Sequence, residues 1–172
     1  MTDPTTDGRS PEAEARVSVQ AEALGVRLAQ SVLSRSSGGG AGLAEFAARM
    51  NLEPDRVQTE LAYVSIITMH FCVSVVFGPD SEDVRVLEGL YRALWSGDPW
   101  CATERGWRAR VREYQHLLSQ PHPDFGRAYG VGRTFARLCG ASHDVAVIEL
   151  GATAFVEQLA PILGVLRSVR VE

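Results

Sequence analysis

Seventeen consecutive residues, 61–77, carry no formal charge and contain neither glycine nor proline. A helix on a protein surface keeps one polar face, so a segment that is apolar on every side belongs inside a protein core or a bilayer. The run is shorter than the ~20 residues that a bilayer requires, and His70 and several hydroxyl groups interrupt it. We therefore predict a buried central helix from Asp55 to Phe77, and no membrane span.

Amphipathic patterns on both sides of this run predict helices that cover it. Apolar residues recur there at intervals of three and four, which is the spacing of one helical face, and no segment shows the alternation of a strand. The predicted buried positions are Val17, Ala21, Leu24 and Leu28 before the run, and Val84, Leu87, Tyr91, Leu94, Trp107, Val111, Tyr114, Leu118, Phe125, Tyr129, Phe135 and Leu138 after it. The sequence therefore predicts an all-α bundle of six to seven helices around the central helix.

The length of 172 residues fits a single domain with one core. Residues 1–10 are polar and predict a flexible tail, residues 11–172 form the predicted domain, and Ser36–Gly40 predict a Ser/Gly loop within it. The acidic start of the chain is unlike a secretion signal, and the three cysteines are widely spaced without a CxxC pair. We expect a cytoplasmic protein.

The charged residues exclude several functions. All 17 basic residues are arginine, which rules out a lysine Schiff base and a phosphate-binding loop that depends on lysine. The net charge of −4 provides no general attraction to nucleic acid or to an anionic membrane. No nucleophile elbow and no dinucleotide-binding glycine loop are present. We expect no cofactor, and an enzyme is not the preferred interpretation.

Two histidines, His70 and His116, are candidate ligands. His70 lies within the apolar run, where a neutral imidazole could bind a metal or a small ligand inside the bundle. No glutamate or histidine follows or precedes it at helical spacing, so a core histidine with hydrogen-bond partners is the competing interpretation. Glu113 and His116 form one E-x-x-H pair, the spacing of di-iron bundles, but the second copy that such a site needs is absent.

Arginines gather on one side of the helix predicted near residue 110. Arg105, Arg108 and Arg112 share a helical face, and guanidinium groups there could bind a phosphate or an acidic partner. A solvated face paired to nearby carboxylates is the alternative, and Glu104 and Glu113 are available for it.

The segment 43–60 resembles the apolar skeleton of a helix-turn-helix. Ala47 falls inside the first helix, Asn51 occupies the turn and Val57 lies in the second helix, so Arg56, Gln58 and Thr59 would contact DNA. Glu53 and Asp55 oppose this interpretation, because they place negative charge at the end that would approach DNA. A DNA-binding regulator is therefore an alternative hypothesis.

A heptad pattern along the last helix carries the leading hypothesis. Apolar residues repeat there at three and four, which predicts a seam that packs either within the chain or between two chains. The seam consists of Val145, Ile148, Ala152, Phe155, Leu159, Ile162 and Leu166. We therefore expect a non-enzymatic interaction or regulatory module that forms a homodimer through this helix, with a small-ligand or metal site near His70 as a further alternative.

Overall fold

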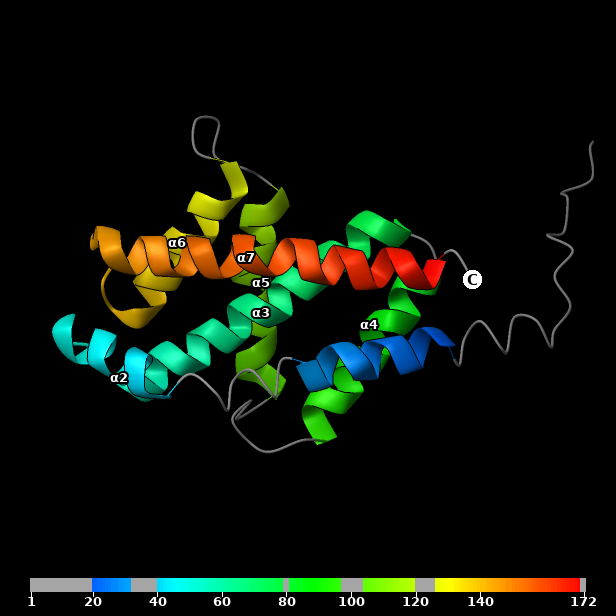
Figure 1. Ribbon diagram of the computed structural model, residues 1–172, viewed down its shortest axis with the longest axis horizontal. Coiled ribbons are helices and arrows are strands. Elements are labelled where there is room, and N and C mark those ends of the chain that lie inside the picture. Colours follow the sequence, from blue (N-terminus) through cyan, green and yellow to red (C-terminus); the bar gives the residue numbers. More distant parts are fainter. Residues whose placement is uncertain (1–19, 32–39, 79–80, 97–103, 120–125, 171–172) are drawn as a thin grey trace, which may run out of the picture.

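The described part of the chain consists of helices joined by short turns. The computed structural model describes residues 20–31, 40–78, 81–96, 104–119 and 126–170, and these contain seven helices and no strand (Figure 1). The helices cover residues 20–31, α2 (Gly40–Arg49), α3 (Pro54–Phe77), α4 (Ser81–Ser96), α5 (Glu104–Ser119), α6 (Gly126–Cys139) and α7 (Val145–Arg170). The all-α bundle is thus confirmed. The predicted tail and the Ser/Gly loop lie outside the described residues, apart from Gly40.

Helix α3 is the centre of the bundle, as the apolar run predicts. It contacts α2, α4, α5, α6 and α7, and in Figure 1 it crosses the molecule between them. Pro54 is well suited to its first turn, because a proline there needs no backbone donor. The helix ends at Gly78, whose φ of 70° favours glycine and whose amide donates to the carbonyl oxygen of Ser74 at 3.1 Å.

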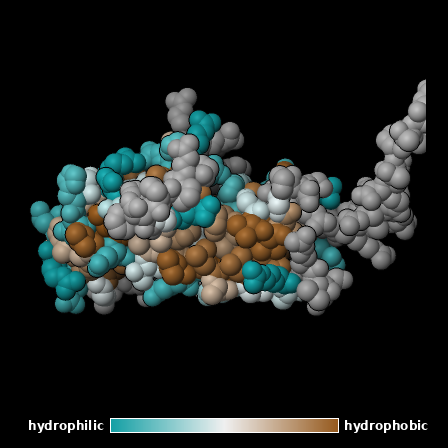
Figure 2. Space-filling model, turned by 90° about the horizontal axis from the view of Figure 1, so that it is seen from above, coloured by the Kyte–Doolittle hydropathy of each residue, from teal (hydrophilic) through white to brown (hydrophobic). Residues whose placement is uncertain are grey.

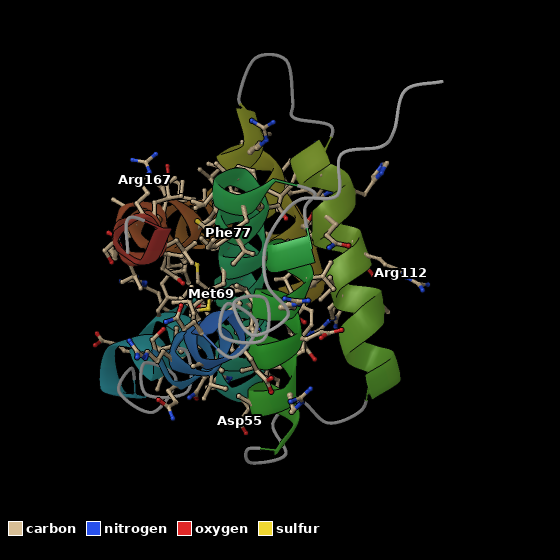
Figure 3. All side chains as sticks on the ribbon, turned by 90° about the vertical axis from the view of Figure 1, so that its right-hand side faces the viewer. Asp55, Met69, Phe77, Arg112 and Arg167 are labelled. Atoms are coloured by element: carbon tan, nitrogen blue, oxygen red, sulfur yellow. The ribbon has the colours of Figure 1, made fainter. Side chains whose placement is uncertain are left out.

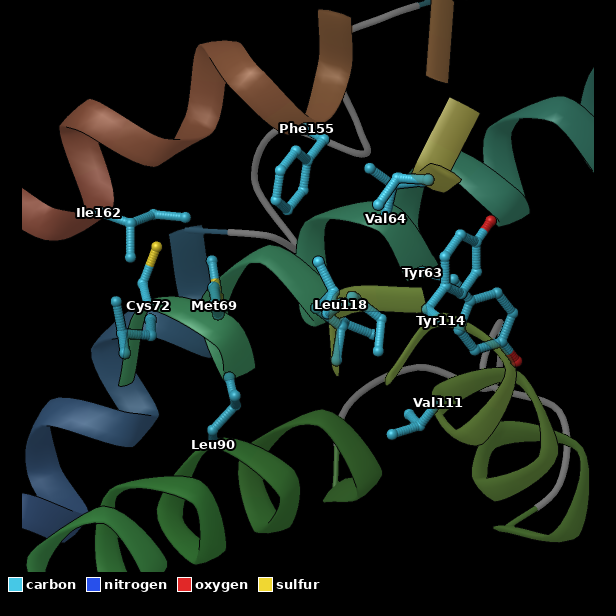
Figure 4. Packing of buried hydrophobic residues seen from close by; sticks show 14 of the residues in the cluster. Tyr63, Val64, Met69, Cys72, Leu90, Val111, Tyr114, Leu118, Phe155 and Ile162 are labelled. Atoms are coloured by element: carbon cyan, nitrogen blue, oxygen red, sulfur yellow. The ribbon is translucent and has the colours of Figure 1, made fainter. Parts of the chain in front are cut away.

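Side chains from the five helices that contact α3 meet it in the core. Figure 4 shows Phe155 and Ile162 of α7 directed towards α3, with Leu90 of α4 approaching from the other side. Ile66 and Ile67 of α3 are completely buried. Burial of each such side chain stabilises the fold by about 1.5–3 kcal/mol, so the packing around α3 dominates the stability of the bundle.

Glycines permit two close helix crossings. A Cβ atom on Gly132 of α6 would overlap the carbonyl oxygen of Ile148, and one on Gly151 of α7 would lie 2.6 Å from the Cβ of Phe135. The helix at 20–31 meets α4 in the same way through Gly25 and Gly89. These positions need glycine because the backbones approach too closely for any side chain.

The buried face of α4 differs from the prediction. Val84 is 51% exposed and Leu87 and Tyr91 are half-buried, whereas Val86, Leu90 and Leu94 are buried. The close approach of Gly89 to the helix at 20–31 places the face with Val86 and Leu90 inward. The prediction was based on the spacing of apolar residues, which does not count a glycine as a contact residue. The predicted faces of the other helices are confirmed at Ala21, Leu24, Leu28, Val111, Tyr114, Leu118, Phe135 and Leu138, whereas Tyr129 is half-buried and the side chains of Val17, Trp107 and Phe125 lie outside the description.

Candidate functional site

A buried ion pair joins α3 to α5. Glu60 is only 2% exposed, and its Oε1 accepts a charged hydrogen bond from Nη2 of Arg110 at 2.9 Å. Burial raises the pKa of the Glu60 carboxyl, an effect that Arg110 and Arg56 partly oppose. A carboxylate removed from water requires such a partner, so the pair holds the two helices in register.

Two further polar groups are buried beside this pair. Within the described residues, neither Oε2 of Glu60 nor the hydroxyl of Tyr114 has a hydrogen-bond partner. Burial raises the pKa of Tyr114 well above its usual value, and the nearby Glu60 carboxylate adds to the shift. Burial also raises the pKa of the Cys139 thiol to about 12. The cluster is therefore closed to solvent and holds its thiol and phenol in the neutral form.

Sequence reasoning missed Glu60 and Arg110. The uncharged run begins at Leu61, so Glu60 lies just outside it, although Val57, Glu60 and Val64 follow the spacing of one buried face. Arg110 lies on the side of its helix opposite to the predicted arginine face of Arg105, Arg108 and Arg112. The side of the helix that carries Arg110 faces α3. The position of Arg110 opposite the other arginines was therefore the sequence signal for its contact with α3.

His70 is part of the scaffold. Its Nε2 accepts a hydrogen bond from the amide nitrogen of Gln115 at 2.8 Å, which leaves Nδ1–H to donate to the hydroxyl of Tyr91 at 2.5 Å. The contacts tie α3 to α4 and α5. Both ring nitrogens are occupied in this arrangement, so neither presents a lone pair to a metal or ligand. The neighbouring hydroxyl of Thr68 donates to the carbonyl oxygen of Val64 at 2.7 Å.

The E-x-x-H pair, Glu113 and His116, makes contacts other than those of the di-iron site that its spacing suggests. Glu113 forms an ion pair with Arg137 of α6, and His116 is exposed. Among the described residues, no three His, Cys, Asp or Glu side chains lie close enough together to hold a metal ion.

The predicted arginine face is only partly described. Arg112 is exposed and points away from the bundle in Figure 3, while the side chains of Arg105 and Arg108 lie outside the description. Two other arginines, Arg133 and Arg137, border a cavity of about 300 Å³ between α5 and α6. The cavity is lined by Leu117, Tyr129, Gly130, Arg133, Thr134, Arg137 and Ser142. Glu113 already neutralises Arg137 there, which weakens the cavity as an anion site.

The corner between α2 and α3 turns at Asn51. Asn51 adopts a φ of 54°, and Ala47 and Val57 are completely buried. An asparagine tolerates this left-handed conformation better than most residues, so it can replace the usual turn glycine. Arg56 and Gln58 are exposed and Thr59 is half-buried. The exposed Glu53 and Asp55 share this end of α3.

The predicted seam of α7 packs within the chain. Phe155, Ile162 and Leu166 are 5% exposed or less, and the ring of Phe155 lies 6.0 Å from that of Phe71 on α3. Their assignment to an interface between two chains is therefore wrong, because they fill this chain's own core. Ile148, Ala152 and Leu159 are half-buried and Val145 is 66% exposed.

The opposite face of α7 is exposed and partly apolar. Val156 is 51% exposed on one flank of this face and Val165 is 46% exposed on the other, and Ala160 and Gly164 are exposed between them. Figure 2 shows apolar surface gathered across the middle of the face seen from above. By length and composition, 54–77 and 145–168 could each cross a membrane, a test that core helices also pass.

No protein-family model matches the chain, and neither a curated protein nor a solved structure matches it. The fold and the sites are therefore interpreted from this chain's own residues. What they define is an all-α bundle whose described polar clusters join helices together, and whose last helix leaves apolar side chains on the surface.

Proposed function

We propose that this protein is a non-enzymatic interaction or regulatory module that forms a homodimer through the outer face of α7. The observation that carries the proposal is the exposure of Val156 in the middle of a long apolar helix. Its neighbours Ala152, Leu159 and Leu163 are half-buried and extend the apolar surface along the helix. A second chain would remove this surface from water, which is the main driving force of association.

The closed polar clusters support a non-enzymatic role. Glu60 and Cys139 are buried, Cys72 on α3 is completely buried, and burial raises the pKa of its thiol to about 11. A nucleophilic thiol requires the opposite environment, one that is accessible and favours the thiolate. His70 is held by Tyr91 and Gln115.

The mass of the protein in solution tests the proposal. Sedimentation equilibrium of the wild type should show a monomer–dimer equilibrium, and Val156→Glu should shift it to monomer because a buried charge opposes association. Val165→Glu is the matched control, since Val165 has similar exposure on the opposite flank of the same helix. Circular dichroism confirms that each variant is folded. A wild type that stays monomeric across the concentration series would end the proposal.

DNA binding through α2 and α3 is the second candidate function. The left-handed Asn51 between the buried Ala47 and Val57 favours it, because these features give the corner of a helix-turn-helix. Gel shift with genomic fragments at two salt concentrations is the test, with Arg56→Ala and Gln58→Ala as contact variants and Arg112→Ala as a control on α5. Binding that is absent, or that both contact variants leave unchanged, would remove this candidate.

A further inference from the structure

Six positions on α7 form a stripe that is symmetric about the level of Gln158. We call them the outer stripe, and they are Glu149, Thr153, Val156, Ala160, Leu163 and Arg167. The intervals between them are four, three, four, three and four residues, the spacing of a helix face that packs on another helix. Five of the six are exposed and Leu163 is half-buried.

We propose that the outer stripe pairs with the same stripe of a second copy in antiparallel orientation, about a two-fold axis at the level of Gln158. This inference rests on the proposed homodimer and specifies its geometry. In an antiparallel pair, positions equally far from the axis face each other. Val156 then faces the partner's Ala160, and Thr153 faces the partner's Leu163.

Charge complementarity selects the antiparallel orientation. Glu149 and Arg167 lie at the two ends of the outer stripe, about 27 Å apart along the helix, and both are exposed. Antiparallel pairing places Glu149 opposite the partner's Arg167 at both ends of the interface. A parallel pair would instead place glutamate against glutamate and arginine against arginine, which is unfavourable.

The sizes of the side chains also suit close packing. Each layer of the antiparallel pair combines a larger apolar group with a smaller one, Val156 with alanine and Leu163 with threonine. Gly164 borders the stripe, and a Cβ atom there would meet nothing within 4 Å. Small residues at such positions let two helices approach closely.

The charges favour a second chain over a lipid surface as the occupant. Glu149 and Glu157 are exposed on the outward side of α7, and a carboxylate is costly in hydrocarbon. In the antiparallel dimer, Glu149 has a cationic partner instead. Co-sedimentation with phosphatidylcholine vesicles provides the contrast: binding to vesicles without dimer formation would overturn the inference.

Charge reversal tests the orientation in solution. Glu149→Arg and Arg167→Glu should each weaken the dimer by about tenfold at low salt, because each replaces two attractive pairs by two repulsive ones. The double variant E149R/R167E restores opposite charges and should recover most of the wild-type affinity. Glu157→Arg, on the same helix but off the stripe, is the control and should leave the affinity near that of the wild type. A double variant as weak as the single variants would overturn the antiparallel geometry.

Cross-linking provides a second measurement. In a Cys101→Ser background, Val156→Cys combined with Ala160→Cys should give a disulfide-linked dimer on mild oxidation, because these positions face each other. Val156→Cys alone should cross-link poorly, since the two copies of residue 156 lie on opposite sides of the axis. Efficient cross-linking by the single variant would indicate a parallel dimer and overturn the inference.

The outcomes separate the two proposals. A monomeric wild type contradicts both the homodimer and its geometry. A dimer that Val156→Glu dissociates, but that shows no rescue in the double charge variant, supports the proposed function and contradicts the antiparallel pairing alone.

Discussion

The two longest helices have similar composition and opposite surroundings. Helix α3 has 24 residues and α7 has 26, and both contain a window apolar enough for a membrane span. In α3, 61% of that window is buried inside the bundle, whereas in α7 only 22% is buried. Composition therefore does not determine burial: among the helices α2 to α7, α3 contacts all five others, whereas α7 contacts only α3 and α6.

Truncation in each helix should give the largest difference. Ile67→Ala in α3 removes a completely buried side chain and should lower the free energy of unfolding by about 2–5 kcal/mol, because it leaves a cavity. Val156→Ala in α7 should change it by less than about 0.5 kcal/mol. Urea denaturation of both variants, at a concentration where the chain is monomeric, measures the difference. Equal losses would show that the outer face of α7 is buried within one chain.

Glycine substitutions should give the next largest effect. Gly132→Ala places a methyl group against the carbonyl oxygen of Ile148 and should destabilise the fold by about 1–3 kcal/mol, since backbone atoms must move. Gly164→Ala on the open side of α7 should be neutral or stabilising by up to about 1 kcal/mol, because alanine favours a helix. Thermal denaturation distinguishes the two. A stabilising Gly132→Ala would contradict the close crossing of α6 and α7.

The buried end of α3 should make stability depend on pH. Burial raises the pKa of Glu60 in the folded state, so between its unfolded and folded pKa values the folded chain binds more protons. The contribution of Glu60 is thus fully present below its unfolded pKa of about 4.3 and is lost as the pH rises through the folded value.

Glu60→Gln should remove this dependence, because glutamine does not titrate. Urea denaturation from pH 4 to pH 8 should show wild-type stability falling, relative to the variant, as the pH rises. The other charges near the site, Arg110, Arg56, Glu113 and Arg137, are common to both proteins. A constant difference between the two proteins across this range would contradict the raised pKa.

Thiol reactivity should change the free energy of unfolding least, but it distinguishes most clearly a buried position on α3 from an exposed position on α7. Burial raises the pKa of Cys72 to about 11, so at pH 8 only about one thiol in a thousand is ionised, and it is also inaccessible. In a Cys101→Ser background, Cys72 and Cys139 should react with a disulfide reagent only on unfolding. At a concentration where the chain is monomeric, Val156→Cys should add one fast-reacting thiol to this background. Fast reaction without that substitution would show that the core opens readily.

Much of the fold followed from local patterns. The uncharged run predicted the central helix, and Pro54 and Gly78 marked its ends because their backbone preferences act within a few residues. The alternative for His70, a core histidine with hydrogen-bond partners, agrees with its bonds to Tyr91 and Gln115, yet these partners come from other helices and could not be named from the sequence.

The predicted interface shows where local patterns fail. The heptad spacing of α7 correctly marked an apolar face, but it could not show that Phe155 and Ile162 pack on α3 of the same chain. The outer stripe, which includes Thr153 and Ala160, is too weakly apolar to stand out beside that seam. The exposed face of α7 could be recognised only once the structure showed which of its side chains are buried.

The sequence by itself determined the helical class, the central position of 61–77 and the ends of the central helix, because spacing and turn preferences depend on neighbours along the chain. Only the tertiary structure decided which apolar faces are covered and that Glu60 pairs with Arg110. The physical reason is that burial and ion pairing depend on residues far apart in sequence. Two helices of similar composition, α3 and α7, can therefore differ in how much of their surface is buried.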